Sequence, residues 1–248
     1  MKKYLKKILK QAVKTLGYEV TPLKGPQQFQ FQPRPEDQFK WIQDYGIHTI
    51  LDVGAHTGES ALQFHSIFPH AKIYSFEPIP ECFRLLESRT QSIPNHFRFN
   101  FAIGDTNGTL DIQKSQYSPS SSLLKMGDLH KSAYPFSSEH SSEKVEIRTL
   151  DELQKEIEHE KLVLLKIDTQ GYEKHVLLGA TETLKNVDII IVETSFEELY
   201  ESQPRFPEIY QMLQEKGFEY KGSWDQFCSP KNGRPLQQDG IFIRVESN

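Results

Sequence analysis

The feature that most constrains the fold is an alternation of short apolar runs, rich in β-branched residues, with longer segments of helical period. Parallel strands need a crossover connection, usually a helix that packs on the sheet. The alternation therefore predicts a doubly wound, mostly parallel sheet with helices on both faces. With 248 residues, 37% of them hydrophobic, the chain is long enough for one such α/β core. The runs cover residues 48–53, 72–77, 97–104, 162–168 and 187–194.

The segments between the runs support this interpretation. Residues 60–68 and the segment around Cys82 carry apolar side chains at helical spacing, as does the segment around Ile209. A short run at 109–113 predicts an additional strand. The last two runs, 218–224 and 240–245, are joined by a loop containing Pro, Asn and Gly. We expect these two to form an antiparallel pair at one edge of the sheet.

The N-terminus differs from the rest. Residues 1–35 contain an apolar stripe among six lysines, followed by a linker rich in proline and glutamine. We expect a basic amphipathic helix that packs on its own domain, on a partner or on an anionic membrane surface. The compact domain is predicted to span residues 36–248.

Charge and cysteine usage exclude several classes of protein. The net charge is −5 although the first 18 residues carry six lysines and no acid, so the remainder is strongly acidic. Such a surface is a poor match for nucleic acid. No run approaches the roughly 20 apolar residues of a membrane span. Cys82 and Cys228 form no metal-ligand pattern, which fits a reducing compartment. We expect a cytoplasmic protein, with the N-terminal helix as a candidate peripheral membrane contact.

Residues 114–144 are rich in serine and show no sustained period. A loop of this length in a compact domain is usually functional or disordered. We interpret it as a lid on the substrate side, with disorder as the alternative. Its aromatic residues Tyr117, Tyr134 and Phe136 would suit a hydroxylated substrate.

The segment ILDVGAHTGES, residues 50–60, ends a buried run at an acid and continues into a loop with Gly54 and Gly58. Ligands of open α/β sheets bind beyond the carboxyl ends of the strands, where glycine lets the backbone approach them. A dinucleotide fingerprint needs glycines at positions one, three and six. Here His56 and Glu59 occupy the last two of these positions. The preceding Asp52 favours a cationic ligand without phosphate, and S-adenosylmethionine is such a ligand.

Glu77 ends the second run, in YSFEP, 25 positions after Asp52. A carboxylate there can accept hydrogen bonds from both hydroxyl groups of an adenosine ribose. The alternative is that Glu77 caps the helix that follows.

Several segments together are similar to one family. The stretches ILDVGAHTGES, SFEP, FAIGDTNGTL, LLKIDTQGYEKHVLLGA, IIIVET and DGIFIRV resemble the FkbM family of S-adenosylmethionine-dependent methyltransferases. The resemblance implies a seven-stranded class I methyltransferase fold of Rossmann-like type and transfer to a hydroxyl oxygen of a sugar, polyketide or similar natural product. Two positions depart from the family pattern, because His56 replaces the usual asparagine and Gln170 the frequent glutamate.

We predict three catalytic candidates. Asp168 ends the fourth run and would orient the acceptor or take its proton; His56 and Glu193 are alternative bases. Lys166 shares a strand face with Asp168 and is expected to pair with Glu193. Asp168 and Glu193 lack a third acid in an adjacent motif, so no metal is predicted. The residues expected to bind the cofactor follow the strands: Asp52, Gly54, Ala55, His56, Thr57, Gly58, Glu59, Ser60, Glu77, Pro78, Ile79, Ala102, Ile103, Gly104, Asp168 and Thr169.

Two other functions are weighed against methyl transfer to a small-molecule or glycan acceptor. A nucleotide-linked oxidoreductase or epimerase is disfavoured by the glycine spacing and by the lack of a Tyr-x-x-x-Lys pair after the fourth run. A non-catalytic protein that binds the cofactor or a partner remains an alternative because Gln170 replaces an acid.

Overall fold

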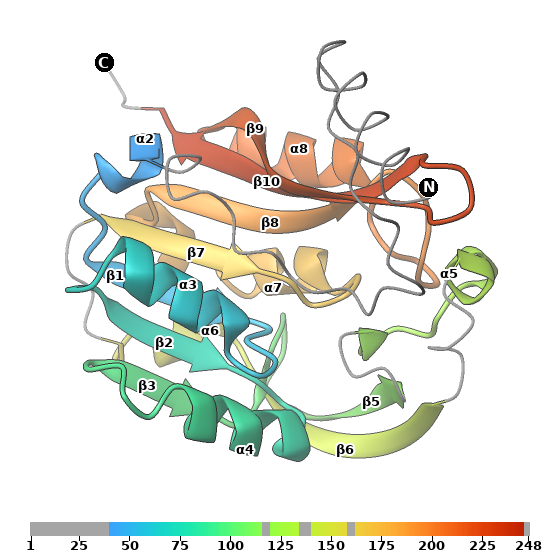
Figure 1. The fold of residues 1–248 in the computed structure, drawn as a ribbon, viewed down its shortest axis with the longest axis horizontal. Coiled ribbons are helices and arrows are strands. Elements are labelled where there is room, and N and C mark those ends of the chain that lie inside the picture. Colours follow the sequence, from blue (N-terminus) through green and yellow to red (C-terminus); the bar gives the residue numbers. More distant parts are fainter. Residues whose placement is uncertain (1–39, 116–119, 134–139, 158–161, 246–248) are drawn as a thin grey trace, which may run out of the picture. The chain divides into compact units, whose positions relative to one another are not determined.

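The computed structural model describes residues 40–115, 120–133, 140–157 and 162–245. Its compact unit, Trp41–Asn248, is built on a seven-stranded sheet (Figure 1). In sheet order the strands are β3 (His96–Phe99), β2 (Lys72–Phe76), β1 (Thr49–Val53), β7 (Val163–Ile167), β8 (Ile189–Ser195), β10 (Pro235–Arg244) and β9 (Phe218–Cys228). The first five are parallel, and β10 runs antiparallel to both β8 and β9. The predicted fold class, including the antiparallel edge, is confirmed.

Helices cover both faces of this sheet (Figure 1). On one face lie α3 (Glu59–Ile67) and α4 (Pro80–Arg89). The helices α6 (Leu150–Leu153), α7 (Glu173–Leu178) and α8 (Phe206–Glu215) each contribute buried apolar residues to one continuous core with the strands. Two further short helices are α2 (Lys40–Gln43), which precedes β1, and the 3-10 helix η4 (Thr183–Asn186), which lies between α7 and β8. No helix within the described ranges is long and apolar enough to cross a membrane.

The predicted third strand, 97–104, is wrong as a single element. It divides into β3 in the main sheet and β4 (Ala102–Ile103) in a second sheet. The physical reason is Asn100, whose Nδ2 donates hydrogen bonds to the carbonyl oxygens of Glu77 (2.9 Å) and Pro78 (3.1 Å). These bonds tie the end of β3 to the segment after β2, and the chain then leaves the main sheet.

The second sheet has the order β4-β6-β5, with β5 (Gly108–Ser115) and β6 (His140–Arg148) antiparallel. Regular structure therefore enters residues 114–144, where the sequence predicted a lid or disorder. Residues Ser141 and Ser142 pair with β5, and α5 (Asp128–Ala133) forms a short helix. Strand pairing across the chain decided β5 and β6, and a local sequence period does not reveal such pairing.

Several predictions fall outside the described residues. The N-terminal helix, the linker and the domain boundary near residue 36 lie there, as do Tyr117, Tyr134 and Phe136. They stay predictions.

Candidate functional site

The sheet order places the candidate residues at one edge. Strand β1 lies between β2 and β7, so the direction in which successive strands are added reverses between β1 and β7. The carboxyl ends of β1, β2, β7 and β8 therefore meet on one side (Figure 1), and such a reversal forms a ligand crevice. Asp52, Glu77, Asp168 and Glu193 lie in or directly after these strands.

The loop after β1 is fixed to two neighbouring strands. The backbone N–H groups of Gly54 and Ala55 both donate to the carbonyl oxygen of Phe76, each at 3.0 Å. Gly54 has φ +81°, and a Cβ there would lie 1.8 Å from the Asp168 carbonyl oxygen. Gly58 has φ +90°, and its Cβ would approach Thr90 Cγ2 to 2.7 Å. Packing against the chain itself therefore requires both glycines, a reason that the sequence pattern did not reveal.

Glu77 connects this loop to α4. Its side chain is buried, with Oε2 accepting the His56 backbone N–H at 2.9 Å and Oε1 accepting that of Ile79 at 2.8 Å. Ile79 is the residue before α4, so the capping role considered from the sequence is present. Each carboxylate oxygen keeps a second lone pair for another donor. Burial raises the pKa of Glu77 to about 7, against the two N–H bonds that lower it.

Asp52 lies beneath the loop and is fully buried. Its Oδ2 accepts a hydrogen bond from Ser75 Oγ at 3.0 Å. Among the described residues, Oδ1 has no hydrogen-bond partner, and Lys166 Nζ lies 3.9 Å away. Burial raises the pKa of Asp52, and the charge of Lys166 opposes this rise.

Lys166 connects Asp52 to Asp168. Its Nζ lies 3.1 Å from Asp168 Oδ2. Burial disfavours the ammonium charge, but Asp168 and Asp52 hold the pKa of Lys166 above its usual range. The predicted pairing of Lys166 with Glu193 is wrong: the lysine contacts the two aspartates, because these carboxylates end or follow the adjacent strands β1 and β7.

Glu193 instead shares a partner with Asp168. Gln170 Nε2 donates to Asp168 Oδ1 and to Glu193 Oε2, each at 2.9 Å. Glu193 is only 5% exposed, whereas 33% of the Asp168 side chain is accessible. Burial, followed by the negative charges of Asp168 and Glu173, raises the pKa of Glu193 well above its usual value. Asp168 is thus the accessible carboxyl group of this pair.

The backbone after β7 is held by a residue that sequence reasoning missed. Glu173 Oε1 accepts hydrogen bonds from the N–H groups of Thr169 and Gly171, each at 3.0 Å, and from the Thr169 hydroxyl at 3.1 Å. Gln170 adopts φ +54° within this turn. The available signal was the motif T-Q-G-Y-E, in which an acid follows a glycine turn at the distance that lets it bind the turn's N–H groups. Tyr200 was also missed, and no local signal marks it.

His56 has a structural role at its backbone and a charged side chain. Its Nδ1 lies 3.8 Å from Glu59 Oε2. Burial opposes the charge, but hydrogen bonds with Cys82 and Glu59 raise the pKa of His56 to about 10. Arg89 Nη1 binds both Thr57 Oγ1 and Glu59 Oε1 at 2.5 Å. A protonated imidazole cannot accept a proton, so the side chain is a poor base at neutral pH.

The residues after β3 lie in or next to the second sheet. Ala102 and Ile103 are buried in β4, and the Gly104 N–H donates to the Arg148 carbonyl at 2.9 Å. Gly104 also contacts α7 closely, since a Cβ at Gly179 would lie 1.8 Å from its carbonyl oxygen. Cofactor binding stays a prediction for Ser60, Pro78, Ala102, Ile103 and Gly104.

His175 binds a neighbour of this segment. Its Nδ1 lies 2.8 Å from Asp105 Oδ2, and its ring stacks on Tyr172.

Within the described residues, no group of three or more His, Cys, Asp or Glu side chains is arranged to hold a metal ion.

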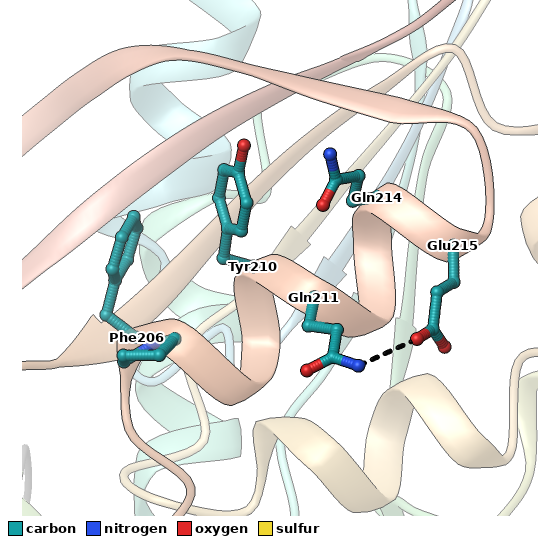
Figure 2. A pocket seen from close by; sticks show the side chains of 6 residues that line it. Phe206, Tyr210, Gln211, Gln214 and Glu215 are labelled. Atoms are coloured by element: carbon teal, nitrogen blue, oxygen red, sulfur yellow. Dashed lines mark hydrogen bonds between the residues drawn. The ribbon is translucent and has the colours of Figure 1, made fainter.

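A pocket elsewhere on the unit contains none of these residues. It has a volume of about 580 Å³ and lies on α8 (Figure 2). Within the described part of the chain, the pocket is lined by Phe206, Pro207, Tyr210, Gln211, Gln214 and Glu215.

Two known methyltransferases are similar in sequence to this chain. Methyltransferase sdnD of Sordaria araneosa is 26% identical over 207 residues, which is 72% of this chain and 78% of that protein. Hexuronic acid methyltransferase AglP of Haloferax volcanii is 28% identical over 147 residues, 58% of this chain and 54% of that protein.

Solved structures that align with this chain have low sequence identity to it. An rRNA methylase from Streptococcus thermophilus aligns with a TM-score of 0.47 at 9% identity, over 88% of this chain and 99% of that one. Aeropyrum pernix fibrillarin with bound S-adenosyl-L-methionine aligns with a TM-score of 0.43 at 12% identity, over 80% of this chain and 66% of that one.

A family model decides the assignment. The model of the methyltransferase FkbM domain matches residues 52–220, from the acid before the glycine loop into the strand after α8. Because this match covers most of the chain, the protein belongs to the FkbM family of methyltransferases, whose methyl donor is S-adenosylmethionine.

Proposed function

We propose that this protein transfers the methyl group of S-adenosylmethionine to a hydroxyl oxygen of a sugar, a glycan or a similar natural product. The observation that carries the proposal is the accessible Asp168 carboxylate, which follows β7 next to the glycine loop and within reach of Lys166. A carboxylate at this place can orient an acceptor hydroxyl and take its proton. The Haloferax relative is named as a hexuronic acid methyltransferase, which supports a sugar as the acceptor class.

The residues present fit the methyl donor. Glu77 keeps one lone pair on each carboxylate oxygen beside its backbone partners, so it can accept both ribose hydroxyl groups. Asp52 is buried below the loop and acts by holding β1, β2 and β7 in register. When bound, S-adenosylmethionine supplies an electrophilic methyl group on its sulfonium.

Asp168 is the best base among the three catalytic candidates. His56 carries a proton at neutral pH because the pKa of its imidazole is about 10. Burial and neighbouring acids raise the pKa of Glu193 well above its usual value, and its side chain is buried, so it is less accessible to an acceptor than Asp168. Asp168 is partly exposed and has a cationic neighbour in Lys166. It accepts the hydrogen bond of the acceptor hydroxyl and takes its proton as the oxygen–methyl bond forms.

The variant Asp168→Asn tests this role. Asparagine keeps the shape but is not a base, so we expect S-adenosylmethionine affinity to stay within a few fold while turnover falls about 10² to 10⁴-fold. Calorimetry gives the affinity, and transfer of radiolabelled methyl to saccharides with free hydroxyl groups gives the turnover. Full activity in the variant would contradict the role of Asp168.

The linkage formed separates the proposed reaction from its alternatives. A methyl ether survives mild base, whereas a methyl ester on a uronate releases methanol. Release of methanol would overturn transfer to a hydroxyl group. Calorimetry with NAD alongside S-adenosylmethionine tests the oxidoreductase alternative, and preferential NAD binding would overturn the proposal as a whole.

A further inference from the structure

Gln170 occupies a position between two carboxyl groups from neighbouring strands. Its Nε2 carries two hydrogens and lies 2.9 Å from both Asp168 Oδ1 and Glu193 Oε2. Asp168 follows β7 and Glu193 lies within β8. One amide group therefore cross-links the ends of two adjacent strands where the acceptor is expected.

The orientation of this amide is defined by a third segment. Tyr200 is 1% exposed, and its hydroxyl lies 3.0 Å from Gln170 Oε1 and 3.2 Å from the Ser120 carbonyl oxygen. The hydroxyl can donate to Gln170 Oε1, which directs Nε2 toward the two carboxyl groups. The opposite orientation would place the amide oxygen against two acceptors.

The backbone of Gln170 is held as firmly as its side chain. Its carbonyl oxygen accepts a hydrogen bond from Ser122 Oγ at 2.6 Å. The adjacent Gly171 packs against Leu124 and Tyr200, since a Cβ there would lie 3.2 Å from each. These contacts come from residues 120–124 and from the segment after β8, so the amide is fixed from several directions.

The two carboxyl groups experience different environments. Asp168 is partly exposed and lies 3.1 Å from Lys166 Nζ. Glu193 is buried, and the charged groups acting on it are Asp168, Glu173 and Asp239, all of them acids. Asp168 is therefore the group of this pair that an acceptor can reach.

We propose that Gln170 is a positioning residue, held by Tyr200, that bonds the Asp168 and Glu193 carboxyl groups through one amide and so fixes the direction in which the accessible Asp168 carboxyl group faces the acceptor. The purpose of this arrangement rests on the proposed function, because it leaves one base of defined direction for the acceptor hydroxyl. A glutamate at this position would add a third acid to the pair, and it would have to carry a proton to replace the amide as a donor.

The test measures the two carboxyl groups directly in the full chain. Their titrations are followed by the ¹³C shifts of labelled Asp and Glu carboxyl carbons, assigned with Asp168→Asn and Glu193→Gln. In Gln170→Ala the donor is lost, so both titrations should move upward by about one pH unit. In Tyr200→Phe the amide loses its orienting hydroxyl, and a smaller upward movement of the same two titrations is expected.

A surface pair provides a matched control. Gln211 Nε2 donates to Glu215 Oε1 at 2.9 Å on α8, far in the sequence from the site (Figure 2). Gln211→Ala removes an equivalent amide and should leave the titrations of Asp168 and Glu193 unchanged.

Unchanged Asp168 and Glu193 titrations in Gln170→Ala would overturn the inference, as would a movement of the same size in Gln211→Ala. If Gln170→Ala does not fold, Tyr200→Phe decides alone, and unchanged titrations there would equally contradict it. These measurements need no cofactor or acceptor. Failure to bind S-adenosylmethionine would contradict the proposed function. It would not change the result expected for Gln170, because the titrations are measured without cofactor.

Discussion

At the scale of single residues, Glu77 has two tasks in the same carboxyl group. It accepts the backbone N–H groups of His56 and Ile79, and it has lone pairs left for the ribose hydroxyl groups. Hydrogen bonds to a charged group contribute roughly 1.5 to 3 kcal/mol each. We therefore expect Glu77→Ala to weaken S-adenosylmethionine binding about 10-fold to 1,000-fold, measured by calorimetry.

The backbone contacts of Glu77 add a second expectation to this variant. Its unfolding midpoint should also fall, because two buried N–H groups lose their acceptor. The control is the 2′-deoxyribose analogue of S-adenosylhomocysteine, which should bind the native protein more weakly than the parent compound. Glu77→Ala should barely distinguish the two ligands. Native affinity in Glu77→Ala would contradict the ribose contact.

At the scale of elements, the loop after β1 depends on the close approach of β1 to the end of β7. Gly54→Ala would place a Cβ 1.8 Å from the Asp168 carbonyl oxygen in a backbone with φ +81°. The loop must then move away from β7, so we expect a loss of about 2 kcal/mol or more in unfolding free energy. Cofactor binding should weaken at the same time, since Glu77 is bound to His56 in the same loop.

Gly46 provides the matched comparison for this prediction. It has φ +60°, and an added Cβ would meet nothing within 4 Å. Gly46→Ala thus carries only the conformational cost of about 1 kcal/mol. Chemical denaturation of both variants measures the difference, and equal losses would show that the contact with Asp168 is not what requires glycine at position 54.

At the scale of the whole molecule, buried acids make stability depend on pH. Burial raises the pKa of both Glu77 and Glu173 to about 7 in the folded protein, above the usual value of 4.5. The stability gained from holding these protons is complete below pH 4.5 and is lost as the pH rises through 7. His56, with its pKa raised to about 10, also loses stabilisation as the pH rises above 6.5.

Stability is compared between pH 6.5 and 8, where the raised pKa values of Glu193 and Asp52 act in the same direction as those of Glu77, Glu173 and His56. His96 and His130 have lowered pKa values of about 3 and about 4, so their opposite contributions are largely complete above pH 6.5. We expect the unfolding free energy without cofactor to fall between pH 6.5 and 8, by roughly 1 kcal/mol for each of Glu77 and Glu173. Urea titrations at both pH values measure it. Glu77→Gln should show a smaller fall, and a rise in the native protein would contradict the assignment.

Much of the fold follows from local features of the sequence. Apolar β-branched runs predicted the strands because such residues pack well on a buried pleated surface. The segments between them predicted the crossover helices, and parallel strands then brought Asp52, Glu77, Asp168 and Glu193 to one edge. The candidate acids could be found because their place at the ends of strands is a local property.

Other features depended on contacts between distant segments. Asn100 ends β3 through carbonyl groups 22 and 23 positions away, and β6 exists because it pairs with β5. The partners of Lys166 and the bridging amide of Gln170 likewise required the folded chain.

The sequence by itself determined most of the strands and the acids at the strand ends, because hydrophobic period and glycine placement act over a few residues. Only the tertiary structure decided which of these acids is buried and which is accessible. Glu193 and Asp168 are both carboxyl groups at neighbouring strands, but burial and nearby charge differ between them. Desolvation and Coulomb interactions depend on distances in space, and those distances exist only once the chain has folded.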